Sequence, residues 1–251
     1  PLPENIENKI INMLPDLLEG ISVVAISDYG KGLLSERLLA SLIKKANELQ
    51  IPIIADPKGH DFSKYCGTTI IKPNLGEAIT ASGMTAHAGL DDVANKVLKI
   101  THAKILMITR SEAGISIFHS DGKRQDFPVR AKEVKDVTGA GDTVLAMLTC
   151  AIASGLTIEE AVQLSNVAAG IAIERLGCAR ISLSELARRL LELDVANKVF
   201  DDEHLYALKS ALQDRKYTLL GLSGKDGMTS ASFTAIRQLK SGPGHDLIVY
   251  L

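Results

Sequence analysis

The sequence lacks three features that would point to particular classes of protein: paired cysteines, a large excess of charge of one sign, and a long apolar run. Its cysteines, Cys66, Cys150 and Cys178, are scattered and form no CxxC pair. This excludes a zinc knuckle or a disulfide framework and is typical of a reducing compartment. The formal net charge of −2 gives no sign of a nucleic-acid-binding protein, which would show a basic patch or stripe. No apolar run reaches about 18 residues and the N-terminus does not read as a signal peptide, so we expect a soluble, cytoplasmic protein with no membrane span.

The chain has 251 residues, of which 46% are hydrophobic, enough to bury one sizeable core. Apolar runs rich in β-branched residues alternate with helical patterns, which predicts an α/β fold with a mostly parallel sheet covered by helices. Strands are predicted at residues 21–27, 51–56, 69–72, 104–109, 115–119 and 125–129. Helices are predicted at residues 4–18, 33–49, 91–101, 140–154, 158–175 and 182–193, the last with a capping box formed by Ser182 and Glu185.

The composition shifts after Asp194, and a second pattern of helix, strand, helix and strand begins. These elements are predicted at residues 201–214, 217–222, 230–240 and 246–251. We therefore expect one domain at residues 1–196, followed at 197–251 by a linker helix and the start of another βαβ unit.

The most informative segment is residues 136–143, Asp-Val-Thr-Gly-Ala-Gly-Asp-Thr, directly before an apolar helix. Its glycines permit a close approach of the backbone to a ligand. The amides of Gly139, Ala140 and Gly141 would then form an anion hole at the helix start, able to hold a phosphoryl group. Asp142 in the first turn is placed to act as the general base toward a hydroxyl group. The alternative is a tight turn with an acid that stabilises the positive end of the helix dipole.

This octet resembles the signature of the ribokinase-like (PfkB) family of carbohydrate kinases, Asp-Thr-x-Gly-Ala-Gly-Asp, with Val137-Thr138 in place of Thr-x. The resemblance implies a three-layer α/β/α fold, ATP with Mg²⁺ as cofactors, and Asp142 as the catalytic base.

Three further segments are similar to family motifs in order and spacing. Residues 72–77, Lys-Pro-Asn-Leu-Gly-Glu, resemble an Asn-x-x-Glu motif, which implies that Asn74, Leu75, Gly76 and Glu77 lie at the ATP phosphates, with Glu77 binding Mg²⁺ through water. The alternative is a polar loop with a helix-capping asparagine.

The second and third segments concern the nucleotide. Residues 109–114 resemble the nucleotide loop Thr-x-Gly-x-x-Gly and imply ATP contacts at Thr109 and Gly114, although Ser111 stands where glycine is usual. Asn166 lies on the helix that would cover the adenine, where the small residues that follow it serve equally for close helix packing.

Residues 27–32, 56–59 and 72–75 narrow the resemblance to the kinase domain of the bacterial bifunctional heptose enzymes. That family implies phosphorylation of D-glycero-D-manno-heptose 7-phosphate at O1, on the route to ADP-heptose and the lipopolysaccharide core. Lys31 and Lys58 would bring positive charge to phosphates, or serve only as solvated surface charges. Another sugar or nucleoside kinase, or a non-catalytic nucleotide-binding fragment, stays open as an alternative.

The resemblance also implies that the kinase fold is N-terminally incomplete, without the strands, the lid and the Gly-Gly-x-x-Asn motif that supply most sugar contacts. We therefore expect an exposed sheet edge, and either a homodimer or pairing with an N-terminal segment. The C-terminal region lacks the His-x-Gly-His motif of an adenylyltransferase, so we interpret residues 197–251 as a degenerate or truncated start of that domain.

Overall fold

The computed structural model describes residues 2–129, 134–177, 180–193, 217–221, 234, 236 and 246–250. The chain divides into two compact units, Pro1–Arg180 and Ile181–Leu251. This division falls earlier than the predicted boundary at residue 197, which itself lies outside the described residues.

The first unit is built around a six-stranded sheet whose strands follow one another in chain order. They are β1 (Val24–Ser27), β2 (Ile53–Asp56), β3 (Ile70–Ile71), β4 (Ile105–Thr109), β5 (Ile115–His119) and β6 (Arg124–Phe127). The pairs from β1 to β4 are parallel, and β5 and β6 extend the sheet as antiparallel strands. The predicted mostly parallel sheet is confirmed, and β1 forms one of its edges.

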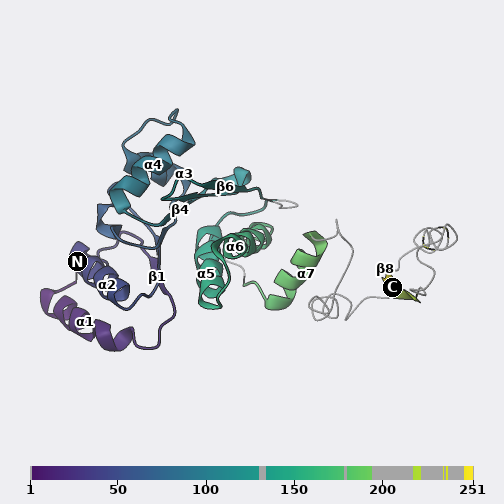
Figure 1. Ribbon diagram of the computed structural model, residues 1–251, viewed down its shortest axis with the longest axis horizontal. Coiled ribbons are helices and arrows are strands. Elements are labelled where there is room, and N and C mark those ends of the chain that lie inside the picture. The colour runs from purple at the N-terminus through teal and green to yellow at the C-terminus, as the bar shows by residue number, and fades with distance from the viewer. Residues whose placement is uncertain are drawn as a thin grey trace. The chain divides into compact units, whose positions relative to one another are not determined.

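Helices cover both faces of this sheet (Figure 1). One face carries α2 (Glu36–Glu48), α3 (Leu75–Ser82) and α4 (Leu90–Thr101), with α1 (Glu4–Leu17) packed beside α2. The other face carries α5 (Ala140–Ala153) and α6 (Ile158–Ile173). Successive strand residues alternate between the two cores: Ile53 and Ala55 pack toward α2, whereas Ile54 packs toward α5 and α6. The predicted three-layer α/β/α arrangement is therefore confirmed.

Local interactions explain where the elements begin. The side chain of Ser35 accepts a hydrogen bond from the amide of Leu38 and starts α2 at Glu36, three residues later than predicted. The first strand starts at Val24 rather than residue 21 because the amide of Ile21 bonds back to Leu18 in the turn after α1. The eight-residue helix α3 was not among the predicted elements, since a helix of two turns gives too short an apolar pattern to recognise.

In the second unit, α7 (Leu183–Leu193) begins at the predicted capping box, in which Ser182 and Glu185 exchange hydrogen bonds. The strands β7 (Tyr217–Gly221) and β8 (Asp246–Tyr250) pair in parallel, as expected for a βαβ unit. The predicted helix at 201–214 lies outside the described residues, and so does the one at 230–240 except for residues 234 and 236. Across the part of the chain that is described, no helix combines the length and the apolar character needed to cross a membrane.

Candidate active site

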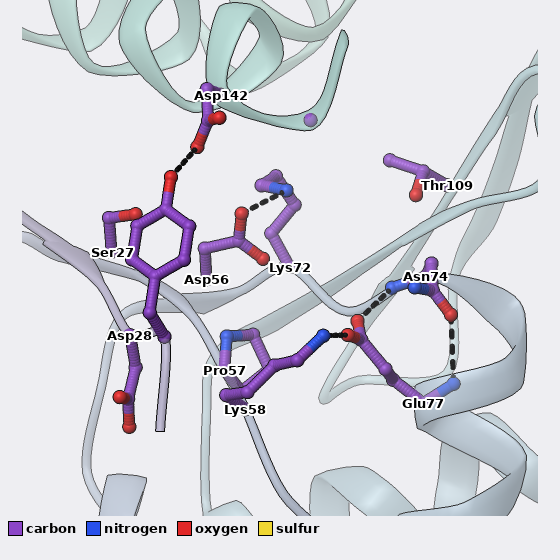
Figure 2. Close-up of a pocket in the computed structure, with 12 residues that line it drawn as sticks. Ser27, Asp28, Asp56, Pro57, Lys58, Lys72, Asn74, Glu77, Thr109 and Asp142 are labelled. Atoms are coloured by element: carbon purple, nitrogen blue, oxygen red, sulfur yellow. Dashed lines mark hydrogen bonds and ion pairs between the residues drawn. The ribbon is translucent and has the colours of Figure 1, made fainter. Parts of the chain in front are cut away.

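A pocket opens at the edge of the sheet where the parallel strands β1 to β4 end. Because the carboxyl ends of parallel strands lie at one edge, residues far apart in the sequence meet there. The start of α5 closes the pocket from the other layer (Figure 2). The lining residues are Ser27, Asp28, Tyr29, Asp56, Pro57, Lys58, Lys72, Asn74, Glu77, Thr109, Gly141 and Asp142.

The start of α5 presents unbonded amides to this pocket. Gly139 precedes the helix with φ of +77°, a left-handed conformation that favours glycine, and its carbonyl accepts the first helical bond from Thr143. The amides of Gly141 and Asp142 have no acceptor among the described residues. The Ala140 amide differs, because it donates to the carbonyl of Val137 at 3.2 Å. Of the predicted anion-hole residues Gly139, Ala140 and Gly141, the pocket is lined by Gly141, whose unbonded amide lies next to that of Asp142.

The carboxylate of Asp142 is exposed and accepts a hydrogen bond at Oδ1 from the hydroxyl of Tyr29, 3.0 Å away. This bond to a carboxylate raises the pKa of Tyr29, since it stabilises the protonated phenol. Tyr29 was not among the predicted site residues. Its position two residues after a strand that ends at the ligand-binding edge was the available signal.

A buried network holds the loop that carries Tyr29. Asp28 accepts hydrogen bonds from the amide of Gly30 at 2.7 Å, from Lys64 Nζ at 2.7 Å and from Tyr65 Oη at 2.6 Å. Burial disfavours the Asp28 carboxylate, but these hydrogen bonds outweigh burial and hold its pKa below the usual range. The carboxylate points away from Asp142 (Figure 2), so its part is to fix the loop. Lys31 does not line this pocket; it lines a neighbouring hollow that shares Ser27, Asp28 and Tyr29 with it.

Two lysines line the pocket and form ion pairs with carboxylates (Figure 2). Lys72 Nζ lies 2.9 Å from Asp56 Oδ2, and Lys58 Nζ lies 2.8 Å from Glu77 Oε1. Burial raises the pKa of Asp56, and this outweighs the opposing effect of Lys72. Lys58 keeps 54% of its side chain exposed, whereas Lys72 keeps 3%. Of these two, only Lys58 was among the predicted phosphate contacts.

Asn74 and Glu77 form the capping box of α3. Asn74 Oδ1 accepts from the Glu77 amide at 2.9 Å, and Glu77 Oε2 accepts from the Asn74 amide at 3.0 Å. The helix-capping alternative is therefore realised, and both side chains also lie on the pocket wall. Between them, Leu75 packs against the core and Gly76 occupies the first turn. No group of three potential ligand side chains among the described residues is placed to hold a metal ion.

The remaining predicted nucleotide residues divide between the pocket and the sheet behind it. Thr109 lines the pocket, and its amide donates to the carbonyl of Pro73 at 3.1 Å. Gly114 and Asn166 do not line it. Both instead meet the end of β6: a Cβ on Gly114 would lie 2.0 Å from the Phe127 carbonyl oxygen, and Asn166 Nδ2 donates to the Pro128 carbonyl at 2.9 Å.

Comparison with known proteins points to the carbohydrate kinases. The family model of the pfkB family carbohydrate kinases matches residues 6–186. The chain is 45% identical over 188 residues to the bifunctional protein HldE of Trichlorobacter lovleyi, covering 74% of this chain and 38% of that protein. It is 44% identical over 188 residues to the bifunctional protein HldE of Geobacter metallireducens, with the same coverage. The chain thus spans less than half the length of these curated relatives.

Solved structures show the same fold at low identity. Phosphofructokinase-2 from Escherichia coli in complex with potassium superimposes with a TM-score of 0.65 at 20% identity, covering 77% of this chain and 63% of that one. Arabidopsis thaliana ribokinase complexed with ribose and ATP gives a TM-score of 0.60 at 19% identity, covering 75% and 59%. The ribokinase-like fold is confirmed, and with the family model matching most of its length the chain belongs to the pfkB family of carbohydrate kinases.

Proposed function

We propose that this chain is the nucleotide-binding and catalytic part of a kinase that transfers the γ-phosphoryl group of ATP to O1 of D-glycero-D-manno-heptose 7-phosphate. One observation carries the proposal: the Asp142 carboxylate and the unbonded amides of Gly141 and Asp142 lie together at the carboxyl edge of the parallel strands. Ligands of open α/β sheets bind at this edge. The heptose as acceptor is supported by the resemblance of residues 27–32, 56–59 and 72–75 to the heptose kinases, and by the shared name of the curated relatives.

In the proposed reaction, Asp142 accepts the proton of the sugar hydroxyl as the oxygen of that hydroxyl forms a bond to the γ-phosphorus. The bond between this phosphorus and the bridging oxygen of ADP breaks, and Asp142 later releases the proton to water. The amides of Gly141 and Asp142 donate hydrogen bonds to the phosphoryl oxygens as charge builds on them. The Tyr29 hydroxyl, which occupies Asp142 Oδ1, gives way to the sugar hydroxyl.

Mg²⁺ would enter with the nucleotide, held by phosphates, waters and one or two carboxylates of the pocket, since the described residues form no metal site of three ligand side chains. Glu77 and Asp142 offer the hard oxygen donors that Mg²⁺ prefers. Both oxygens of Glu77 are already engaged, by Lys58 and by the amide of Asn74, which favours contact through water. When bound, the ion supplies positive charge against the phosphates.

Removal of the proposed base tests this function. Asp142→Asn should lower the rate of ADP formation from ATP and heptose 7-phosphate by about 10²- to 10⁴-fold, the usual contribution of a general base. Asp121→Asn, in the hairpin turn between β5 and β6, is the matched control and should leave the rate unchanged. Equal rates for Asp142→Asn and the unmodified chain would overturn the assignment of the base. A faster reaction with ribose or fructose 6-phosphate would overturn the choice of sugar.

A further inference from the structure

Lys72 is a buried positive charge in a pocket whose other lysine, Lys58, is exposed. It directly follows β3, and its amide donates to the carbonyl of Ala55 at 2.8 Å, which fixes the start of the side chain. Its side chain is 3% exposed and ends 2.9 Å from Asp56 Oδ2. Lysine is rarely buried to this extent, because removing an ammonium group from water costs several kcal/mol. Solubility does not explain a lysine that is buried at this place, so we looked for a ligand that its charge would bind.

The ammonium group lies next to the turn that begins α5. A Cβ built on Gly141 would be 3.8 Å from Lys72 Nζ. The amides of Gly141 and Asp142, which have no acceptor among the described residues, belong to the same stretch of pocket wall. An ammonium group has three donors, and one points to Asp56. The cation and the two amides thus belong to one part of the pocket wall, which favours an anion such as a phosphoryl group.

Lys58 provides the contrast within the same pocket. Its ammonium group is also paired, with Glu77, but its side chain is 54% exposed and can rotate away from this partner. Lys72 cannot, because protein surrounds its stem and Asp56 holds its end (Figure 2). Charge that is already in place when the reaction begins contributes most to stabilising a transferring phosphoryl group.

We propose that Lys72 binds the γ-phosphoryl oxygens of ATP beside the turn at residues 139–142, and that Asp56 positions the ammonium group for this contact. The assignment rests on the proposed kinase function, since it places the nucleotide in the same pocket. If Lys72 served the fold alone, its ion pair with Asp56 would be its whole role and it would not affect nucleotide binding.

The test compares the binding of ATP and ADP by isothermal titration calorimetry, without sugar, so that no turnover is needed. Lys72→Met leaves the partly buried Asp56 without its ion-pair partner, which is destabilising. The double variant Lys72→Met/Asp56→Asn removes both charges and keeps the volumes similar, and circular dichroism verifies its fold. The double variant should lose at least about tenfold in ATP affinity, the loss of one charge-assisted hydrogen bond, while ADP affinity changes by less than about threefold. Lys123→Met, at an exposed lysine that lies outside the pocket and pairs with Asp121, is the control and should keep the ATP preference of the unmodified chain.

Two outcomes would overturn the proposal, and they are distinguishable. A folded double variant with the ATP-to-ADP preference of the unmodified chain would show that Lys72 does not contact the γ-phosphoryl group, while the kinase function would stand. An unmodified chain that binds neither nucleotide would overturn the kinase function and the Lys72 contact together.

Discussion

Alanine at Gly114 tests whether this glycine serves the nucleotide or the packing of the sheet. The residue has φ of +81° and ψ of −139°, a conformation open essentially only to glycine. A Cβ there would lie 2.0 Å from the carbonyl oxygen of Phe127, 2.8 Å from the amide nitrogen of Val129 and 2.9 Å from the Cα of Pro128. All three neighbours are backbone atoms, so no side-chain rotation relieves the overlap.

The loss of stability expected for Gly114→Ala is the sum of two free-energy costs. The backbone conformation costs about 1–3 kcal/mol for a residue with a Cβ, and overpacking adds about 1–3 kcal/mol. We therefore expect Gly114→Ala to lower the free energy of unfolding by about 2–6 kcal/mol, a large share of the about 5–15 kcal/mol typical of a domain.

Gly122→Ala is the matched control for this prediction. Gly122 also has a left-handed conformation, with φ of +90°, but a Cβ there would have no atom within 4 Å. Only the conformational cost of about 1–2 kcal/mol applies. Urea unfolding of both variants measures the difference. Equal midpoints for the two variants would refute the packing argument, and so would a Gly114→Ala variant that keeps its stability but loses ATP binding.

Two further predictions concern the loop after β1. Tyr29→Phe removes the hydroxyl that donates a hydrogen bond to Asp142 Oδ1. In steady-state assays the KM for the sugar should therefore fall by about 2- to 10-fold, the contribution of one hydrogen bond, with kcat nearly unchanged. A tenfold rise in KM would show instead that Tyr29 binds the sugar. Asp28→Asn should lower the free energy of unfolding at pH 7 by about 1.5–3 kcal/mol, because hydrogen bonds to a buried charge are lost. The folded-state pKa of Asp28 is depressed, so its contribution is present above the ordinary value near pH 4 and fades as the pH falls below it. Urea unfolding should therefore show a difference in stability between Asp28→Asn and the unmodified chain at about pH 7 that shrinks at about pH 3. A difference that persists at low pH, or an equal loss of stability in the exposed control Asp16→Asn, would contradict the role of the charge.

The layers of the fold were predictable because their signals are local. The parallel strands carry apolar residues on both faces, as the alternation of Ile53, Ile54 and Ala55 between the two cores shows. The start of α5 at Ala140 followed from the glycine-rich segment at residues 139–141, and the start of α7 from its capping box. Signals of this kind need only neighbouring residues.

The composition of the pocket was harder to predict because it depends on which strands are neighbours. Asp56 and Lys72 lie at the ends of two strands, 16 positions apart in the sequence, and nothing local shows that their side chains meet. Gly114 was predicted to bind the nucleotide from its place in a loop motif, whereas its surroundings are set by the antiparallel partner strand β6. The sequence pattern identifies a glycine, but the reason for it comes from the tertiary structure.

The charges on the pocket wall connect these separate observations. The carboxylate of Asp28 points away from the pocket (Figure 2). The other charged groups of the wall are three carboxylates and two ammonium groups, those of Asp56, Glu77, Asp142, Lys58 and Lys72. Each lysine is paired, which leaves Asp142 as the carboxylate of this set without a cationic partner among the described residues. An uncompensated carboxylate is what a general base requires, but it also repels a polyphosphate. The free amides at the start of α5, the fixed charge of Lys72 and a cation that accompanies the nucleotide all offset this repulsion, and they do so at the phosphates without neutralising Asp142. The arrangement therefore separates the positive groups that would bind phosphate from the negative group that would accept the proton.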